Sequence, residues 1–236
     1  MLATKKKKQN RTAHWKLWFV ILLVPVTLSI YIVAYFLWVG IQELPVFAKG
    51  AIDEELYAAI QEDFDMQIPL EYIPVYMAAE EKYGVPWTLL AAHHRIETRF
   101  STMNTLVSPV GAEGHMQFMP CTFVGWSHPT CSNLGEGDIS QEELTNVETI
   151  KKYGGYGVDA NGDGIADPYD IEDAVFSAAN YLARSGVAKG ELKKAIFAYN
   201  HDEQYVEDVL FFYKKYEGVR DKLEIVMSEN EKKIEQ

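Results

Sequence analysis

Residues 97–120 read ETRFSTMNTLVSPVGAEGHMQFMP and combine a single acid with a turn and a glycine-rich run. Glu97 stands at the end of a mostly apolar segment with helical spacing. Gly111 and Gly114 carry no side chain, so the backbone there can come close to another group. The four residues after His115 (MQFM) supply an apolar wall with one amide in it. The stretch therefore predicts a cleft with a carboxyl at its edge.

Two helices are predicted ahead of this stretch. The first covers residues 69–83 and ends at Gly84, a residue that commonly terminates helices. The second has Pro86 in its first turn and runs through WTLLAAHHRIETRF. Glu97 lies one step beside the buried stripe of this second helix, at the edge of the core, where a carboxyl is partly desolvated. The stripe consists of Leu89, Ala92, Ile96 and Phe100.

The rest of the chain indicates a mainly α domain, because neither alternating strands nor repeats occur. Residues 125–157 are rich in loop-forming residues, and Asp170 is the expected N-cap of the helix after them, with Asp173 three residues on. The globular domain should cover residues 68–223, with a charged tail over 224–236. Three further helices are predicted at residues 171–184, 189–199 and 203–216.

The N-terminal region predicts a membrane anchor. Residues 17–39 (LWFVILLVPVTLSIYIVAYFLWV) carry no charge and, as a helix, span roughly 34 Å, enough to cross a bilayer. Residues 1–16 are basic, so the N-terminus should be cytoplasmic and the rest extracellular, in a single-pass protein of the cell membrane. A cleaved signal peptide is the alternative, but the apolar run is too long for one. Residues 40–67 are predicted to form a juxtamembrane stalk, either a short helix that lies on the globular part or a spacer.

The charge balance argues against a nucleic-acid partner. The formal net charge is -12, and the six basic residues ahead of residue 17 hide a stronger excess of acids. The remainder holds 16 Lys and Arg against 34 Asp and Glu, so no basic surface is available to neutralise phosphates.

Cys121 and Cys131 are the only cysteines, and both belong to the part predicted to lie outside the cell. They flank a loop rich in glycine, proline and serine. An oxidising compartment favours a disulfide between them, whereas a cytosolic protein would keep two free thiols.

An acid that cleaves a glycosidic bond must be protonated near neutral pH, and a free glutamate, with a pKa of about 4.3, is not. Apolar walls raise the pKa of such a glutamate to about 6 in lysozyme. Ile96, Phe100, Met116 and Phe118 are the candidate walls for Glu97. Taken alone, Glu97 would be one more solvated glutamate on a helix.

Three motifs change that interpretation. They are Ile96-Glu97-Thr98-Arg99-Phe100, then Ser108-x-x-Gly111-Ala112-x-Gly114-x-Met116-Gln117-x-Met119-Pro120, then Ala198-Tyr199-Asn200. In order and spacing they resemble the lytic transglycosylases of the soluble-lysozyme-like (goose-lysozyme-like) superfamily over residues 68–216. Thr98 stands where serine is commonest, His115 where an apolar residue is common, and Cys121 in place of a small polar residue.

The resemblance implies a lysozyme-like catalytic domain in which Glu97 is the sole acid and base. Glu97 would protonate the oxygen that links N-acetylmuramic acid (MurNAc) to N-acetylglucosamine (GlcNAc) in peptidoglycan. The same carboxylate would then accept the proton of the C6 hydroxyl of the muramyl sugar, which leaves a 1,6-anhydro end. This route needs neither a second carboxylate nor a cofactor.

The same resemblance assigns substrate contacts. Gln117 would bond sugar, Ser108 and the Met116 backbone would hold an acetamido group, and Tyr199 would bond Glu97 or support the charged transition state. For Tyr199 and Met116, plain packing in the core is the alternative. The expected substrate-binding set is Ser108, Gly114, Met116, Gln117, Tyr199 and Asn200.

An aspartate-rich segment, DANGDGIADPYD, has the ligand spacing of a calcium loop with a glycine at its sharp turn. Its last ligand position is an aspartate where glutamate is usual. The alternative is a capped turn whose carboxylates bond backbone N–H groups. Any ion would be structural. The candidate ligands are Asp159, Asn161, Asp163, Ile165, Asp167 and Asp170.

Together these features predict a membrane-anchored peptidoglycan lytic transglycosylase that cleaves the MurNAc–GlcNAc β-1,4 bond in local cell-wall remodelling. Growth of the wall, secretion and conjugation are the processes it would serve, with their machinery as partners. The alternatives are a muramidase, a hydrolytic lysozyme on the same fold, and a non-catalytic glycan-binding subunit of an envelope-spanning apparatus.

Overall fold

The computed structural model describes residues 31–33, 35, 68–132 and 134–234. The chain divides into two compact units, Met1–Leu56 and Tyr57–Gln236. Four residues of the predicted membrane span are described, and all four are helical. No helix within the described ranges is long and apolar enough to cross a membrane. The remaining segments predicted ahead of the globular domain (1–16, the rest of 17–39, and 40–67) lie outside the described residues.

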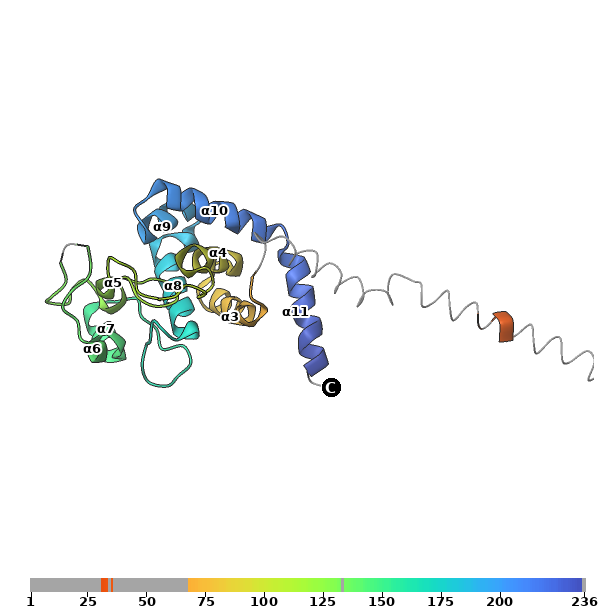
Figure 1. The fold of residues 1–236 in the computed structure, drawn as a ribbon, viewed down its shortest axis with the longest axis horizontal. Helices are drawn as coiled ribbons and strands as arrows, with labels where there is room; N and C mark the ends of the chain where they lie inside the picture. The colour runs from red at the N-terminus through yellow and green to blue at the C-terminus, as the bar shows by residue number, and fades with distance from the viewer. Residues whose placement is uncertain (1–30, 34, 36–67, 133, 235–236) are drawn as a thin grey trace, which may run out of the picture. The chain divides into compact units, whose positions relative to one another are not determined.

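The described part of the second unit is helical, and its β-pairings are isolated bridges (Figure 1). The predicted mainly α class is therefore confirmed for these residues. The elements in chain order are η2 (Leu70–Tyr72), α3 (Ile73–Tyr83), α4 (Trp87–Thr98), α5 (Pro120–Val124), α6 (Gln141–Thr145), α7 (Val147–Tyr153), α8 (Ile171–Ser185), η3 (Val187–Lys189), α9 (Leu192–Tyr199), α10 (Glu203–Glu217) and α11 (Arg220–Ile234).

Helix α4 lies at the centre of the helical core. It contacts α3, α8 and α10, and Figure 1 shows α10 passing alongside it. Because neighbours cover it on several sides, every residue from Trp87 to His94 is buried, including both histidines. The last turn of α4, which contains Glu97, lies beyond these buried residues, at the edge of the core.

Several element ends follow directly from local chemistry. Gly84 ends α3 in the left-handed conformation, with φ of 67°. Asp170 caps α8, and its side chain accepts hydrogen bonds from the N–H groups of Glu172 and Asp173. Gly190 is also left-handed and separates η3 from α9, so the helix predicted at 189–199 begins only at Leu192.

The predicted loop over residues 125–157 contains two short helices, α6 and α7. Each has a capping side chain: Ser140 accepts from Glu143 N, and Asn146 accepts from Thr149 N. Helices of five and seven residues are too short to show an apolar period, which is why the pattern along the sequence did not predict them.

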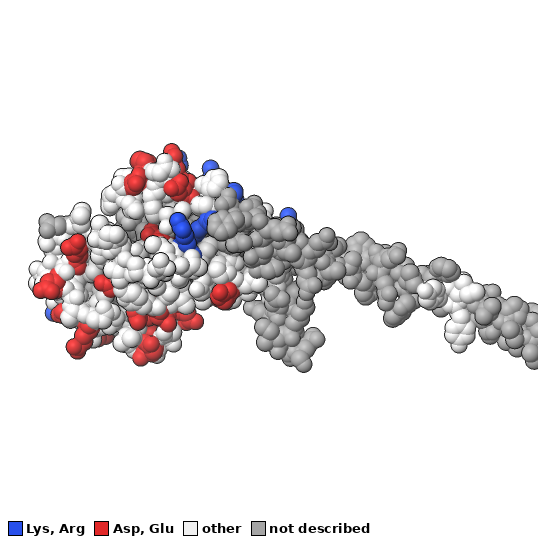
Figure 2. Space-filling model, viewed as in Figure 1, with Lys and Arg blue, Asp and Glu red and all other residues white. Residues whose placement is uncertain are grey.

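An ion-pair cluster connects the start of α11 to the start of α4. Arg220 contacts the carboxylates of Glu80, Glu217 and Glu224, and Glu224 also accepts a hydrogen bond from Trp87 Nε1 at 2.9 Å. The predicted charged tail thus begins inside a helix. Acidic side chains occur at several places on the visible face of this unit (Figure 2).

Candidate active site

Glu97 occupies the last turn of α4, immediately ahead of a sharp change in backbone direction. Arg99, Phe100 and Ser101 have φ values of 53°, 57° and 64°, a left-handed conformation that residues other than glycine seldom adopt. Three such residues in succession end the helix abruptly. Backbone strain of this kind concentrates at functional sites, where the surrounding packing maintains it.

The Glu97 carboxyl is held in an environment that favours its neutral form. Burial raises the pKa of Glu97 to about 8, and a hydrogen bond from Tyr205 opposes the shift. In that bond the Tyr205 hydroxyl donates to Glu97 Oε1. At neutral pH the carboxyl is therefore mostly protonated, which is the state that a general acid requires.

A buried histidine extends this contact into the core. His93 Nδ1 lies 2.8 Å from the Tyr205 hydroxyl oxygen. Because the single Tyr205 proton goes to Glu97, His93 must donate its Nδ1 proton to that oxygen. Burial lowers the pKa of His93 to about 3, so the ring is neutral. Its Nε2 is buried without a hydrogen-bond partner among the described residues.

Tyr205 is a site residue that the sequence analysis did not identify. It is 108 positions from Glu97 and is brought there because α10 packs along α4. A signal was available: Tyr205 and Val209 are buried one helical turn apart on α10, so a tyrosine with a polar tip falls on an apolar stripe close behind Tyr199-Asn200.

The four residues predicted to form an apolar wall, Met116 to Met119, belong to a compact set of turns that begins near Gly111. Glu113 and Phe118 pair through both backbone hydrogen bonds, at 2.8 and 2.9 Å. Gln117 between them is left-handed, with φ of 49°. Its amide nitrogen donates to the carbonyls of Leu106 and Gly114, each at 2.8 Å. The Gln117 nitrogen is thus committed to holding the turn, which leaves the amide oxygen for a ligand.

Side-chain hydrogen bonds tie this wall to the end of α4. Thr98 Oγ1 donates to the carbonyl of His115 at 2.8 Å. His115 Nε2 lies 2.7 Å from the carbonyl of Tyr169, and its Nδ1 lies 2.5 Å from Ser101 Oγ. A carbonyl only accepts, so Nε2 carries the proton and Ser101 donates to Nδ1. Ser101 Oγ in turn accepts from His94 Nε2 at 2.7 Å.

The other predicted substrate residues take up varied positions. The Tyr199 hydroxyl donates to the Met116 carbonyl at 2.7 Å rather than to Glu97, and its ring lies 4.9 Å from that of His93. The Met116 side chain is buried in the core. Ser108 Oγ accepts from Ala112 N at 2.8 Å. Asn200 follows the last residue of α9 and is exposed.

The aspartate-rich segment bonds its own backbone. Asp159 accepts from the N–H groups of Gly162 and Gly164, at 2.7 and 3.0 Å. The other side-chain acceptors follow the same pattern, Asn161 with Asp163 N, Asp163 with Ile165 N, Asp167 with Tyr169 N, and Asp170 at the α8 cap. Within the described ranges no three acidic, histidine or cysteine side chains could share an ion. The predicted ligand set also contains the Asn161 amide and the Ile165 backbone carbonyl, which are not among these side-chain types, so calcium binding stays a prediction.

Asp173 organises this segment from α8. Its buried carboxylate accepts from Ala160 N at 2.7 Å and from Asp167 N at 2.8 Å. The segment in turn supports the wall, since His115 N donates to the carbonyl of Pro168 at 3.0 Å. The aspartates thereby help to position the residues beside Glu97.

Replacing Gly114 with alanine should destabilise the fold strongly, because a Cβ there would overlap the carbonyl oxygen of Pro168. Gly154 is the matched control: its φ of 74° is close to the 79° of Gly114, but a Cβ there meets nothing within 4 Å. We expect a loss of about 1 kcal/mol for Gly154→Ala from the backbone alone and about 2–4 kcal/mol for Gly114→Ala from backbone plus overlap. Denaturant unfolding measures both, and equal losses would contradict the described contact.

The predicted disulfide is confirmed, since Cys121 and Cys131 are bonded with their Cα atoms 5.7 Å apart.

In comparisons with known proteins, residues 151–208 match a family model described as the transglycosylase SLT domain. The matched stretch contains Asp173, Tyr199 and Tyr205 but not Glu97. No curated protein and no solved structure matches the chain.

Proposed function

We propose that this chain is a peptidoglycan lytic transglycosylase in which Glu97 is the only acid and base. One observation carries the proposal: the Glu97 carboxyl at the end of α4 accepts a hydrogen bond from the Tyr205 hydroxyl of α10, in surroundings where burial raises its pKa to about 8. The match of residues 151–208 to the transglycosylase SLT domain supports the same activity independently, because it does not contain Glu97.

The reaction uses the carboxyl twice. Tyr205 occupies Glu97 Oε1, so the proton is carried on Oε2 and passes to the oxygen of the MurNAc–GlcNAc β-1,4 bond as that bond breaks. The carboxylate then accepts the proton of the muramyl C6 hydroxyl while the C6 oxygen bonds to C1. One bond between sugars breaks, one internal ring closes, and Glu97 is protonated again. Water is not a reactant in this route.

Tyr205 and His93 support both halves of this cycle. When Glu97 has lost its proton, the Tyr205 hydroxyl stabilises the carboxylate, and His93 keeps that hydroxyl directed at Glu97 by donating to its oxygen. A hydrolase would use a second carboxylate at a defined distance to activate water, whereas the proposed route requires none.

Digestion of purified peptidoglycan, followed by mass spectrometry of the muropeptides, tests the proposal. We expect products that end in 1,6-anhydro-MurNAc. Reducing MurNAc ends would assign a muramidase to this cleft. Binding of glycan with no release of fragments would assign a non-catalytic subunit.

The pH dependence follows from the pKa of Glu97. The first step requires the protonated acid, and the pKa of about 8 keeps the acid protonated through neutral pH. We expect kcat/KM to be level around pH 6–7 and to fall as the pH rises through about 8, since kcat/KM reports groups of the free enzyme. A pH–rate profile on solubilised glycan strands measures this. A fall centred near the ordinary glutamate value of about 4.3 would contradict the assignment.

The uncharged run at residues 17–39 supports a membrane anchor, with the N-terminus cytoplasmic and the catalytic domain outside. From that position the enzyme would open the wall locally, for growth or for a secretion or conjugation apparatus. Fractionation of cells and protease accessibility of residues 68–223 test the location. Loss of membrane association in a chain lacking residues 17–39 is the expected result.

A further inference from the structure

His115 is bonded to two different parts of the molecule through all four of its polar atoms. Toward the end of α4, its carbonyl accepts from Thr98 Oγ1 at 2.8 Å and its Nδ1 accepts from Ser101 Oγ at 2.5 Å. Toward the segment ahead of α8, its backbone N–H donates to the Pro168 carbonyl at 3.0 Å and its Nε2 to the Tyr169 carbonyl at 2.7 Å. The two ring bonds therefore join the end of α4 to that segment, and an apolar side chain could make neither of them.

The bond to Ser101 belongs to a chain of hydrogen bonds that ends in the core. His94 Nε2 donates to Ser101 Oγ at 2.7 Å, and His94 Nδ1 lies 2.6 Å from the buried Tyr76 hydroxyl. Burial lowers the pKa of His94 to about 3 and also lowers the pKa of His115, so each ring is neutral and carries one proton. Because the Tyr169 carbonyl can only accept, each proton along the chain has one possible place, and Tyr76 donates to His94.

Ser101 is the last of the three left-handed residues that follow the end of α4. Such a turn persists only where its surroundings hold it. Here both histidine rings bond the Ser101 side chain, and its backbone N–H donates to Thr98 Oγ1 at 3.1 Å. Release of Ser101 from His115 would let the turn relax, and the last turn of α4, which contains Glu97, would shift with it.

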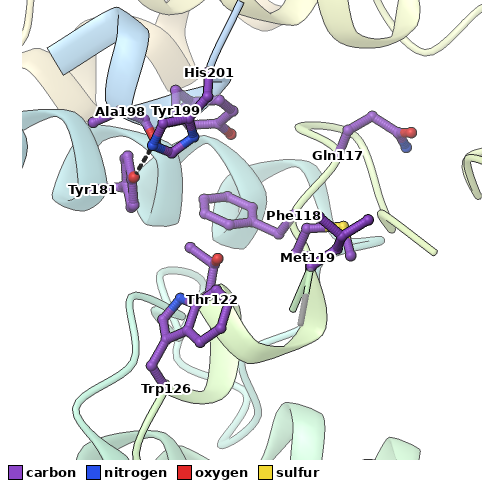
Figure 3. Close-up of a pocket in the computed structure, with 10 residues that line it drawn as sticks. Gln117, Phe118, Met119, Thr122, Trp126, Tyr181, Ala198, Tyr199 and His201 are labelled. Carbon is purple, nitrogen blue, oxygen red and sulfur yellow. Dashed lines mark hydrogen bonds between the residues drawn. The ribbon is translucent and has the colours of Figure 1, made fainter. Parts of the chain in front are cut away.

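The wall that follows His115 in the chain faces the proposed cleft. Gln117 and Phe118 line a pocket of this cleft together with Tyr199 at the end of α9 (Figure 3). His115 is not among the described residues that line the pocket, so its ring acts on the cleft through the wall. The hydrogen bonds of the Gln117 amide do not involve that ring. Loss of a ring bond would therefore shift the wall as a unit and leave its own shape intact.

We propose that His115 is a positioning residue, whose bond to Ser101 fixes the Glu97 carboxyl at the distance from the wall that proton transfer requires. The inference rests on the proposed function, since it takes Glu97 as the acid and the wall as the surface that holds the sugar. The bond to Tyr169 contributes to stability rather than to rate. A displacement of about 1 Å between reacting groups reduces a rate about 100-fold. Loss of the Ser101 bond therefore lowers kcat and leaves KM, because the wall still binds the sugar.

Two substitutions of His115 separate its two ring bonds. In His115→Asn, the amide oxygen stands about where Nδ1 was and still accepts from Ser101, but the bond to Tyr169 is lost. In His115→Gln, the amide nitrogen stands about where Nε2 was and still donates to Tyr169, but the bond from Ser101 is lost. The backbone bond from Thr98 remains in both, so displacements are small. We expect kcat to fall about 10-fold in His115→Gln and less than about 2-fold in His115→Asn, with KM within about 2-fold of the wild type in both.

A second comparison shows whether the two residues act through one bond. Ser101→Ala removes the same bond from the other side, so adding His115→Gln to it should cause no further loss of kcat. Thr102→Ala is the control in the same turn, since its exposed hydroxyl bonds the Arg99 carbonyl at 2.8 Å, and its kcat should equal that of the wild type. The alkaline midpoint of kcat/KM should stay at about 8 in every variant. General loosening of the site would instead let water reach the carboxyl and lower that midpoint.

Kinetics of glycan cleavage by the full-length chain and its variants measure all of these quantities. A wild-type kcat in His115→Gln, with anhydro products formed by the wild-type chain, would overturn this inference alone. Equal losses of kcat in His115→Asn and His115→Gln would also overturn it, as would a lowered midpoint. If His115→Gln does not fold, Ser101→Ala against Thr102→Ala carries the same prediction.

The products separate this inference from the proposed function. Reducing ends released by the wild-type chain would overturn the lytic route, while the expected difference in kcat between His115→Asn and His115→Gln would still support the positioning role. A wild-type chain that cleaves no glycan would overturn both.

Discussion

Replacing Glu97 with glutamine should reduce the release of anhydro-muropeptides by at least about a hundredfold, within the range of 10²–10⁴ that general acid–base catalysis contributes. The amide oxygen of glutamine still accepts the hydrogen bond that Tyr205 donates to Glu97. The wild-type carboxyl is also mostly uncharged at neutral pH. The variant should therefore fold normally and lose only the transferable proton.

Muropeptide chromatography measures the turnover of Glu97→Gln, and the melting temperature shows whether the variant folds normally. Glu81→Gln is the matched control, because Glu81 is an exposed glutamate on α3 outside the site. Its activity should equal that of the wild type. Full activity in Glu97→Gln would remove Glu97 from the mechanism.

Replacing Tyr205 with phenylalanine should have the second largest effect. The substitution removes the donor to Glu97 Oε1 and the acceptor for His93 Nδ1. Because the Tyr205 hydrogen bond lowers the pKa of Glu97, its loss should raise that pKa above about 8. The fall of kcat/KM at high pH should then move to still higher pH. A hydrogen bond to a charged group contributes about 1.5–3 kcal/mol, so turnover should drop about 10- to 100-fold.

The pH–rate profile separates this role from a general loss of packing, which would lower activity without moving the midpoint. Tyr213→Phe is the control on the same helix, since Tyr213 is half-buried on α10 and lies outside the site. We expect its midpoint to match that of the wild type. An unmoved midpoint in Tyr205→Phe would contradict the coupling between Tyr205 and Glu97.

The elements that the sequence predicted well are those defined by local rules. Gly84 ends α3, and Asp170 caps α8, because both depend on residues within one helical turn. The position of Glu97 at the edge of a buried helix followed from the apolar spacing of α4. Helices α6 and α7 were not predicted because they are too short to show an apolar period, although each has a capping side chain.

The spacing of residues along the sequence could not predict which side chains contact Glu97. Tyr205 reaches Glu97 only because α10 lies along α4, and Tyr199, which the motif suggested as a partner, bonds Met116 instead. The aspartate-rich segment shows a related ambiguity. Carboxylates at calcium-loop spacing also accept hydrogen bonds from nearby N–H groups, as Asp159 does here, and the pattern alone does not separate the two.

Cleavage of peptidoglycan in H₂¹⁸O tests the mechanism most directly, because the two chemistries differ in whether solvent oxygen enters the product. A route in which Glu97 alone moves the proton, and the C6 hydroxyl attacks C1, predicts muramyl ends without ¹⁸O. Incorporation of one ¹⁸O per cleaved bond at the muramyl C1 would show that water attacks, and would contradict the role assigned to this carboxyl.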